Sequence, residues 1–390
     1  MSQRDPGQID SHVTKRPVTW TAILRVLLKA AGLFLLLNLL FAWFMPLEKL
    51  GALSLYNTLL PGRLRLPYGE NPADSYNLSL SNIPAMLASH EITQAGQEEA
   101  FRVMVIGDSG TWGWLQENDQ TLAGQINALD LMTEDGRPVV ADNLGYPIMA
   151  LSKDLLLLDA AMAYEPDLVL WPVTLQSFPI DKQLEPPLVQ ENPEPMRALI
   201  EEYGLGLDYD DPRFVEPSFW DRTLFGQRRA LSDLLRLQLY AFSWAATGVD
   251  QAYPEEIQLR KSDFEIDLSW GEYEEPQALD ETVLAFEVLQ AGLARAGEVP
   301  LLIVNEPIYI SEGENSQLRY NAWYPRWAYD QYRELFGATA VAGDWNYLDL
   351  WDAVDADEFT DSPVHLTPAG SRQLAELLAP SILELSRESP

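Results

Sequence analysis

The stretch Phe101–Leu115, FRVMVIGDSGTWGWL, contains the feature that decides the fold. Its first part, Phe101–Ile106, is a short apolar run typical of a buried strand, and it stops at the sequence GDSG. A strand that breaks into a tight glycine turn and then enters a helix leaves the side chain of Ser109 on a sharp corner, beside exposed backbone N–H groups. Such a corner suits a nucleophile. Asp and Ser at a strand-to-helix turn also serve as ordinary helix caps, so this stretch alone leaves both interpretations open.

Composition limits the class of protein. The chain has 390 residues, of which 47% are hydrophobic, which is enough for one large α/β domain with insertions or for two smaller domains. The absence of cysteine excludes disulfides and thiolate metal sites, and three scattered histidines leave no plausible metal cluster. From residue 50 onward, 20 Lys and Arg face 56 Asp and Glu. Because nucleic acids are bound mainly through Lys and Arg, we expect no nucleic-acid partner, and we also expect no metal and no cofactor.

The amino-terminal part of the chain predicts a membrane helix. Residues 30–47 contain no charge, and Trp20–Leu28 can extend this run towards the roughly 20 residues that span a bilayer. Four Lys and Arg residues between positions 15 and 29 favour a cytoplasmic N-terminus. We therefore expect a cytoplasmic tail at 1–19, a single transmembrane helix at 20–47 and an extracytoplasmic remainder. A cleaved signal peptide is the alternative, although no convincing small-residue cleavage site follows the apolar run.

The remaining chain divides into three regions. Residues 48–100 are rich in turn signals and are interpreted as a connector or collar, in which His90 is expected at the surface or in the collar. From residue 101, strands and helices alternate, which predicts a five-stranded parallel sheet with helices on both faces. The expected strands are 101–106, 138–144, 167–173, 300–304 and 347–351, and the expected helices are 121–129, 153–164, 279–296, 326–336 and 368–385.

An insertion at 179–276 interrupts this alternation. It is rich in proline and acidic residues, and its one convincing helix covers 228–247. We interpret the insertion as a lid over the sheet. Ligands of such sheets bind beyond the carboxyl ends of the strands, so Asn305 and Glu306, which directly follow the fourth strand, are candidates for substrate contact. Polar residues at strand ends also cap neighbouring helices, which is the alternative.

The carboxyl-terminal region offers a partner for the serine. His365 lies on the loop after the fifth strand, whereas the other two histidines lie before the predicted anchor and in the collar. A serine nucleophile that needs an imidazole base therefore has one good candidate. Asp361, four residues earlier, is placed to accept a hydrogen bond from the other ring nitrogen of His365.

Together these residues resemble the SGNH or GDSL hydrolase family. Gly107–Ser109 matches the Gly-Asp-Ser motif, Asn143–Gly145 matches the second block, and the loop with Asp361 and His365 matches the last block. The resemblance covers roughly residues 101–385 outside the insertion. It implies a flavodoxin-like, three-layer α/β/α sandwich, with the hydrolase-like domain at 101–390.

The resemblance also implies roles for individual residues. Ser109 would be the nucleophile, His365 the base and Asp361 its orienter. The oxyanion hole would use the N–H groups of Ser109 and Gly145 and the amide of Gln176. Two departures are visible: Thr174 and Gln176 stand where the family has glycine and asparagine, and Asp361 precedes His365 by four residues instead of three, with Ser362 in the usual place.

The expected function is therefore a membrane-anchored serine esterase or deacetylase. Its substrate would be an acyl ester, with acetyl esters of cell-envelope polysaccharide as the leading candidate. Two alternatives remain: an O-acyltransferase that moves an acyl group to a sugar hydroxyl, and a binding or assembly protein that retains the fold without catalysis. The expected partners are the ester or carbohydrate substrate and the membrane.

Overall fold

The computed structural model describes residues 19–45, 50, 62–68, 82–93, 99–247 and 257–387. These fall into two units, one formed by Met1–Pro46 with Pro217–Arg228 and the other by Leu47–Glu216 with Arg229–Pro390. Nearly all of the expected tail at 1–19 and most of the expected connector at 48–100 lie outside the described residues. The domain boundaries given above remain predictions.

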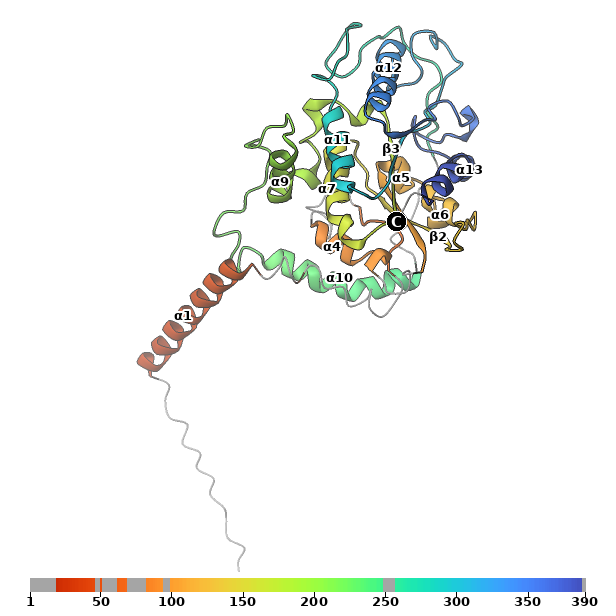
Figure 1. Cartoon of the computed structure of the whole chain (residues 1–390). Helices are drawn as coiled ribbons and strands as arrows, with labels where there is room; N and C mark the ends of the chain where they lie inside the picture. Colours follow the sequence, from red (N-terminus) through yellow and green to blue (C-terminus); the bar gives the residue numbers. More distant parts are fainter. Residues whose placement is uncertain are drawn as a thin grey trace, which may run out of the picture. The chain divides into compact units, whose positions relative to one another are not determined.

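The larger unit is built on a five-stranded parallel sheet, as predicted (Figure 1). The strand order is β2-β1-β3-β4-β5, and in the register between the first two strands Gly107 lies opposite Gly145. Strands β3 and β4 are buried along their whole length, because helices cover both faces, whereas the edge strand β5 is partly exposed. The strands are β1 (Phe101–Gly107), β2 (Val139–Gly145), β3 (Leu168–Val173), β4 (Leu301–Asn305) and β5 (Asn346–Asp349).

Two hydrophobic clusters hold the helices against the sheet. One cluster joins one face of the sheet to α6 (Leu122–Asn127) and α13 (Pro368–Leu385). The other joins the opposite face to a second set of helices and to the collar (Figure 1). The helices of this second face are α4 (Ile83–Ala88), α7 (Leu151–Ala161), α8 (Pro187–Gln190), α9 (Pro193–Tyr203), α11 (Phe286–Ala296) and α12 (Arg326–Ala342). The result is the expected three-layer α/β/α arrangement.

Two helices have the predicted bounds, whereas others differ: the helix expected at 326–336 continues to Ala342, and the insertion contains the helix α9 besides the one predicted. The helices at 228–247 (α10, Arg228–Thr247) and 368–385 begin and end as predicted. The helix expected from residue 279 begins only at Phe286. The preceding backbone pairs with the chain after β3: Ile180 N–H donates to Val283 O, and Ala285 N–H donates to Phe178 O. Those long-range bonds replace the helical ones.

The collar histidine is not at the surface. His90 is completely buried, with Nδ1 accepting from Ile92 N–H and Nε2 lying 3.0 Å from Asn143 O. Burial lowers the pKa of His90 to about 4, so the ring is neutral at physiological pH. His90 therefore fastens the collar to β2.

The smaller unit contains α1 (Trp20–Phe44). Thr19 caps its start, and it ends at Met45, which is in the left-handed conformation and precedes Pro46. Within the described residues, α1 is the one helix long and apolar enough to cross a membrane, a property that a membrane anchor and a signal sequence share. It is slightly shorter than the predicted span at 20–47.

Candidate active site

The end of β1 presents Ser109 on a sharp turn. Ser109 is the first residue of the short helix α5 (Ser109–Trp112), and the Asp108 carboxylate caps this helix by accepting Gly110 N–H at 2.7 Å. Gly107 has a φ of 152°, and a Cβ there would lie only 2.4 Å from Thr111 Oγ1. The turn therefore needs glycine at 107, and it leaves the Ser109 side chain half-buried at the sheet edge.

The loop before α13 brings an imidazole to this serine. His365 Nε2 lies 2.8 Å from Ser109 Oγ, although the two residues are 256 positions apart. His365 Nδ1 lies 2.8 Å from Asp361 Oδ1. The structure thus places the three predicted residues in one hydrogen-bonded chain, with the carboxylate on one ring nitrogen and the hydroxyl on the other.

The four-residue spacing between Asp361 and His365 has a local explanation. The hydroxyl of Ser362 accepts the N–H groups of Val364 at 3.3 Å and His365 at 3.2 Å, so the additional residue is accommodated in a tight turn. Partial burial raises the pKa of Asp361, but the hydrogen bond and charge of His365 outweigh it, and the pKa lies below its ordinary value. Asp361 is therefore ionised at neutral pH, as an orienting carboxylate requires.

Trp114 is a site residue that the sequence analysis did not identify. Its ring stacks on the imidazole of His365, with centroids 6.0 Å apart and planes at 25°. Its backbone N–H donates to Ser109 O at 3.0 Å. The residue lies in the same stretch as the nucleophile turn, but an aromatic residue there is no specific signal, since most such residues are simply core.

One predicted oxyanion donor needs correction. The N–H of Gly145 already donates to Asn143 Oδ1 at 3.0 Å inside the protein, so it is not available to a substrate oxygen. Gly145 is required for a different reason: a Cβ there would lie 2.4 Å from Trp112 N, so the glycine lets β2 approach the nucleophile turn. By contrast, the N–H of Ser109 donates to no atom of the described residues.

The third block is rearranged around Tyr324. The Tyr324 hydroxyl lies 3.1 Å from Thr174 Oγ1 and accepts the backbone N–H of Gln176 at 3.3 Å. Gln176 is half-buried, and its side-chain amide makes no hydrogen bond to a described residue. It remains a candidate oxyanion donor, with a side chain not committed elsewhere in the described part of the chain.

Asn305 and Glu306 are not placed for substrate contact. Asn305 is fully buried, donates to Asp349 Oδ1 at 2.7 Å and accepts the hydroxyl groups of Tyr329 and Tyr332. Glu306 is 5% exposed. The prediction was wrong because residues at a strand end can also pack in the protein interior beneath the crevice, as these two side chains do.

Glu306 belongs to a buried charged cluster under the nucleophile turn. Lys153 is fully buried, donates at 2.8 Å to both Gly107 O and Tyr146 O, and contacts the Asp154 carboxylate. Burial raises the pKa of Glu306 well above its ordinary value, and the pKa of Asp154 to about 6. Glu306 Oε2 lies 3.5 Å from the position that a Cβ at Gly110 would occupy. The cluster thus contacts the buried side of the turn at Gly107 and Gly110.

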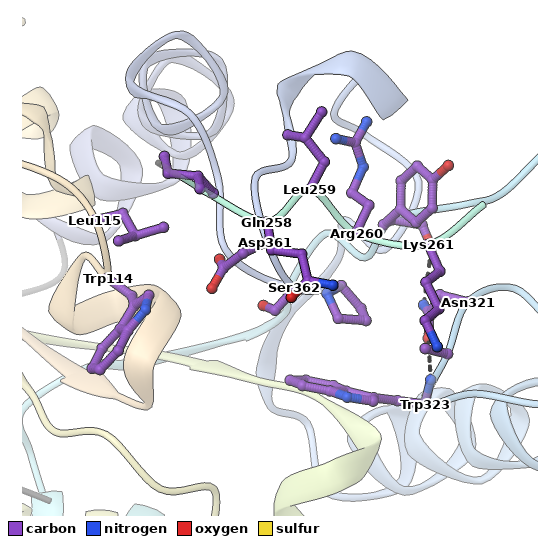
Figure 2. Close-up of a pocket in the computed structure, with 14 residues that line it drawn as sticks. Trp114, Leu115, Gln258, Leu259, Arg260, Lys261, Asn321, Trp323, Asp361 and Ser362 are labelled. Carbon is purple, nitrogen blue, oxygen red and sulfur yellow. Dashed lines mark hydrogen bonds between the residues drawn. The ribbon is translucent and has the colours of Figure 1, made fainter. Parts of the chain in front are cut away.

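A pocket of about 500 Å³ adjoins the hydrogen-bonded chain, a size typical of small-ligand sites. Figure 2 shows Trp114 and Leu115 on one side, Asn321 and Trp323 on the other, and Asp361 between them. Residues of the insertion, Leu259–Lys261 among them, complete the lining. Arg260 fixes this segment because its guanidinium donates to Phe359 O and Ala356 O and lies 4.4 Å over the ring of Tyr309.

No group of three or more His, Asp or Glu residues in the described part of the chain is arranged to hold a metal ion. The site consists of protein groups: a hydroxyl, an imidazole and a carboxylate in sequence. Such an arrangement is typical of serine hydrolases.

Comparison with known proteins gives structural matches. No protein-family model matches the chain, and no curated protein matches its sequence. Among solved structures, the chain matches a carbohydrate acetylesterase family member from Sinorhizobium meliloti at 12% identity, covering 73% of this chain and 99% of that one, with a TM-score of 0.32. It also matches the native aryl esterase of M. smegmatis at 13% identity, covering 73% and 100%, with a TM-score of 0.34.

Because the identities and TM-scores of these matches are low, the matches carry no argument about the family, activity or substrate of this chain.

Proposed function

We propose that this chain is a serine esterase with Ser109 as nucleophile, His365 as general base and acid, and Asp361 as the carboxylate that orients the imidazole. The observation that carries the proposal is the continuous hydrogen-bonded chain from Asp361 through His365 to Ser109, beside an open pocket. A structural serine gains nothing from an imidazole held in this way, whereas a nucleophile requires it.

The geometry supports acyl transfer in two steps. His365 Nε2 removes the proton as Ser109 Oγ bonds to the acyl carbon, and the imidazolium returns that proton to the departing alcohol oxygen, which leaves an acyl-enzyme. Water then attacks the acyl carbon by the same route, releasing a carboxylic acid and regenerating the serine. The Ser109 N–H and the Gln176 amide are the proposed donors to the oxyanion.

The pocket favours an acyl ester carried by a carbohydrate. Trp114 and Trp323 offer aromatic faces on opposite sides of the pocket. Sugar rings stack on aromatic faces of this kind. An acetylated polysaccharide fits this lining, and the same lining fits an O-acyltransferase in which a sugar hydroxyl replaces water in the second step.

The site is proposed to work outside the cytoplasm. In this arrangement α1 is an uncleaved anchor with its N-terminus in the cytoplasm, because the positive charges of the chain's first 29 residues precede or open the apolar helix. The protein would then act at the cell membrane on esters of the envelope.

Labelling with a fluorophosphonate probe tests the nucleophile. The full chain is compared with Ser109→Ala, His365→Ala and the control Ser243→Ala, whose serine is exposed on α10. We expect stoichiometric labelling of wild type and control, none of Ser109→Ala, and a loss of at least about 10³-fold in labelling rate for His365→Ala.

A folded wild-type chain that takes no label would contradict catalysis and favour the binding or assembly alternative. Among catalytic outcomes, acetate release from acetylated sugar supports the esterase. Acyl transfer that depends on an added sugar acceptor supports the transferase.

A further inference from the structure

A segment far along the chain belongs to the same unit as the apolar helix α1. Pro217–Arg228 and Met1–Pro46 form one unit, and the N–H of Phe225 donates to Asn38 Oδ1 at 2.9 Å. Asn38 also donates through Nδ2 to Phe34 O at 2.8 Å. The polar side chain within this apolar helix thus uses a distant segment of the chain as its partner.

The position of Asn38 sets the level of that contact along α1. Asn38 lies six residues before the last residue of the helix, Phe44, or about 9 Å along the axis. A helix of 25 residues is about 37 Å long, slightly longer than the roughly 30 Å hydrocarbon core of a bilayer. If α1 spans the bilayer, Phe225 therefore lies near the boundary between acyl chains and headgroups.

The side chains of Pro217–Arg228 suit that boundary. Phe219, Trp220 and Phe225 are 50%, 71% and 60% exposed, which is unusual for three large apolar residues within seven positions. Trp43 and Phe44 are also exposed, at the end of α1 that lies nearer to this contact. Aromatic residues are enriched at the interfaces of bilayers, where their rings lie at headgroup level.

The backbone of the segment is folded on itself, as shallow insertion requires. Thr223 Oγ1 donates to Trp220 O and accepts Gly226 N–H at 3.1 Å, and Gln227 N–H donates to Thr223 O at 2.8 Å. A Cβ at Gly226 would lie 2.3 Å from Trp220 O, so glycine is needed for this tight turn. The main-chain N–H groups of Gly226 and Gln227 are thus bonded within the segment, while the three aromatic rings are exposed.

Charge points to a phospholipid surface as the partner. The segment has Arg222 and Arg228 against the single acidic residue Asp221, in contrast to the strong acidic excess of the chain after residue 50. The Arg228 guanidinium lies 4.5 Å over the ring of Phe225. An arginine beside an interfacial ring is well placed to meet a headgroup phosphate.

We propose that Pro217–Arg228 is a membrane-binding loop that inserts Phe219, Trp220 and Phe225 into the headgroup region of the leaflet in which α1 ends. The proposal rests on the anchoring of α1 proposed above. It also requires that α1 is retained, because cleavage would remove the partner of the Phe225 N–H.

Spin labelling tests the loop directly, since the chain contains no cysteine. A nitroxide is attached to one introduced cysteine in each of four single variants. These are Leu33→Cys in α1, Phe219→Cys and Trp220→Cys in the loop, and Val341→Cys as an aqueous control. Each full-length chain is reconstituted into vesicles of phosphatidylcholine and phosphatidylglycerol. We expect labels at 33, 219 and 220 to collide more with oxygen than with a water-soluble nickel chelate, and the label at 341, which replaces a side chain 84% exposed, to do the reverse.

The outcomes separate the two levels of the proposal. If the labels at 219 and 220 collide mainly with the nickel chelate, as the label at 341 does, while the label at 33 collides mainly with oxygen, the membrane-binding loop is contradicted and the membrane anchor is not. A label at 33 that collides mainly with the nickel chelate contradicts both the membrane anchor and the membrane-binding loop.

A second experiment separates membrane contact from catalysis. The triple variant Phe219→Ser, Trp220→Ser, Phe225→Ser should keep wild-type fluorophosphonate labelling of Ser109 in detergent. A nitroxide is also attached to Ser218→Cys, with and without these three substitutions, and both chains are reconstituted into vesicles. The three substitutions should increase the collision of the nitroxide at 218 with the nickel chelate relative to oxygen. If these collisions do not change, the membrane-binding loop is contradicted, whatever the result of the labelling at Ser109.

Discussion

Two groups of charged or polar residues meet at the carboxyl edge of the sheet, and their environments differ completely. Ser109, His365 and Asp361 form one hydrogen-bonded chain, and Asp361 lines an open pocket. Lys153, Asp154 and Glu306 lie beneath the same turn, and none is more than 5% exposed. Both groups come from strand ends, the start of α7 and the loops of one sheet edge, so position in the topology does not distinguish them.

The hydrogen bonds of the two groups explain the difference. In the group beside the pocket, Asp361 has a partner for its charge and its pKa lies below the ordinary value. In the buried group, Glu306 Oε1 has no hydrogen-bond partner among the described residues, and burial raises the pKa of Glu306. Partners lower the pKa of one carboxyl, and burial raises the pKa of the other. Solvent access and partners therefore decide which strand-end carboxyl serves chemistry and which serves architecture.

The largest expected effect separates the groups by activity. Asp361→Asn keeps the size of the side chain but removes the negative charge that fixes the imidazole tautomer and stabilises the imidazolium, so kcat should fall roughly 10³–10⁴-fold. The rate of acetyl ester hydrolysis measures this, with the fluorophosphonate labelling rate as a second readout. Thr360→Val is the control, because its hydroxyl contacts Asp361 without touching the imidazole.

A fall of less than about tenfold in Asp361→Asn would show that His365 is oriented without its carboxylate. The control should remain within about tenfold of wild type, since loss of the Thr360 hydroxyl, which lies 3.1 Å from both Asp361 Oδ1 and His365 O, leaves the bond between Asp361 and the imidazole in place.

The next effect concerns stability. Lys153 is the cation of the buried cluster, and Lys153→Met removes it while leaving Asp154 buried without its charge partner. Breaking a buried pair in this way costs roughly 3–5 kcal/mol, so the urea midpoint should fall strongly. The double variant Lys153→Met, Asp154→Leu removes both charges and should recover a large part of the loss.

Equal stability of wild type and Lys153→Met would show that the cluster does not support the turn. Failure of the double variant to recover stability would point instead to the two bonds that Lys153 donates, to Gly107 O and Tyr146 O.

The same distinction explains how far the sequence could predict the molecule. Apolar runs bounded by glycine and the alternation with helices were sufficient for five parallel strands, because burial on both faces imposes that pattern. Ser109 and His365 carried specific signals, a GDSG turn and a rare histidine on a late loop. Asp361 was found at an unusual spacing, and the Ser362 turn supplies the reason.

What could not be predicted depends on contacts between distant residues. Nothing in the sequence indicates that Gly145 N–H is satisfied by Asn143, that Trp114 stacks on His365, or that Glu306 is sealed from solvent. These facts follow from packing at the sheet edge, where one rotamer decides whether a side chain enters the crevice or the core. The start of α11 was likewise decided by pairing with residues a hundred positions earlier.

The smallest expected effect tests the neutral state of the buried carboxyl. Glu306→Gln keeps the shape and a donor, so catalysis should stay within a few-fold of wild type, and the free energy of unfolding at pH 5 should change by less than about 1.5 kcal/mol. The pH dependence is the sharper readout. Because the folded pKa of Glu306 is raised above its ordinary value of 4.5, the unfolded chain releases this proton first as pH rises, and wild type loses stability above that value. The glutamine variant has no such proton, so its stability relative to wild type should increase from pH 5 to pH 8. Urea unfolding at each pH measures the difference, in which the other titrating groups, such as Glu91 and His90, largely cancel. A difference that is constant with pH, or that falls as pH rises, would mean that Glu306 is ionised in the folded protein, and the contrast with Asp361 would then rest on solvent access alone.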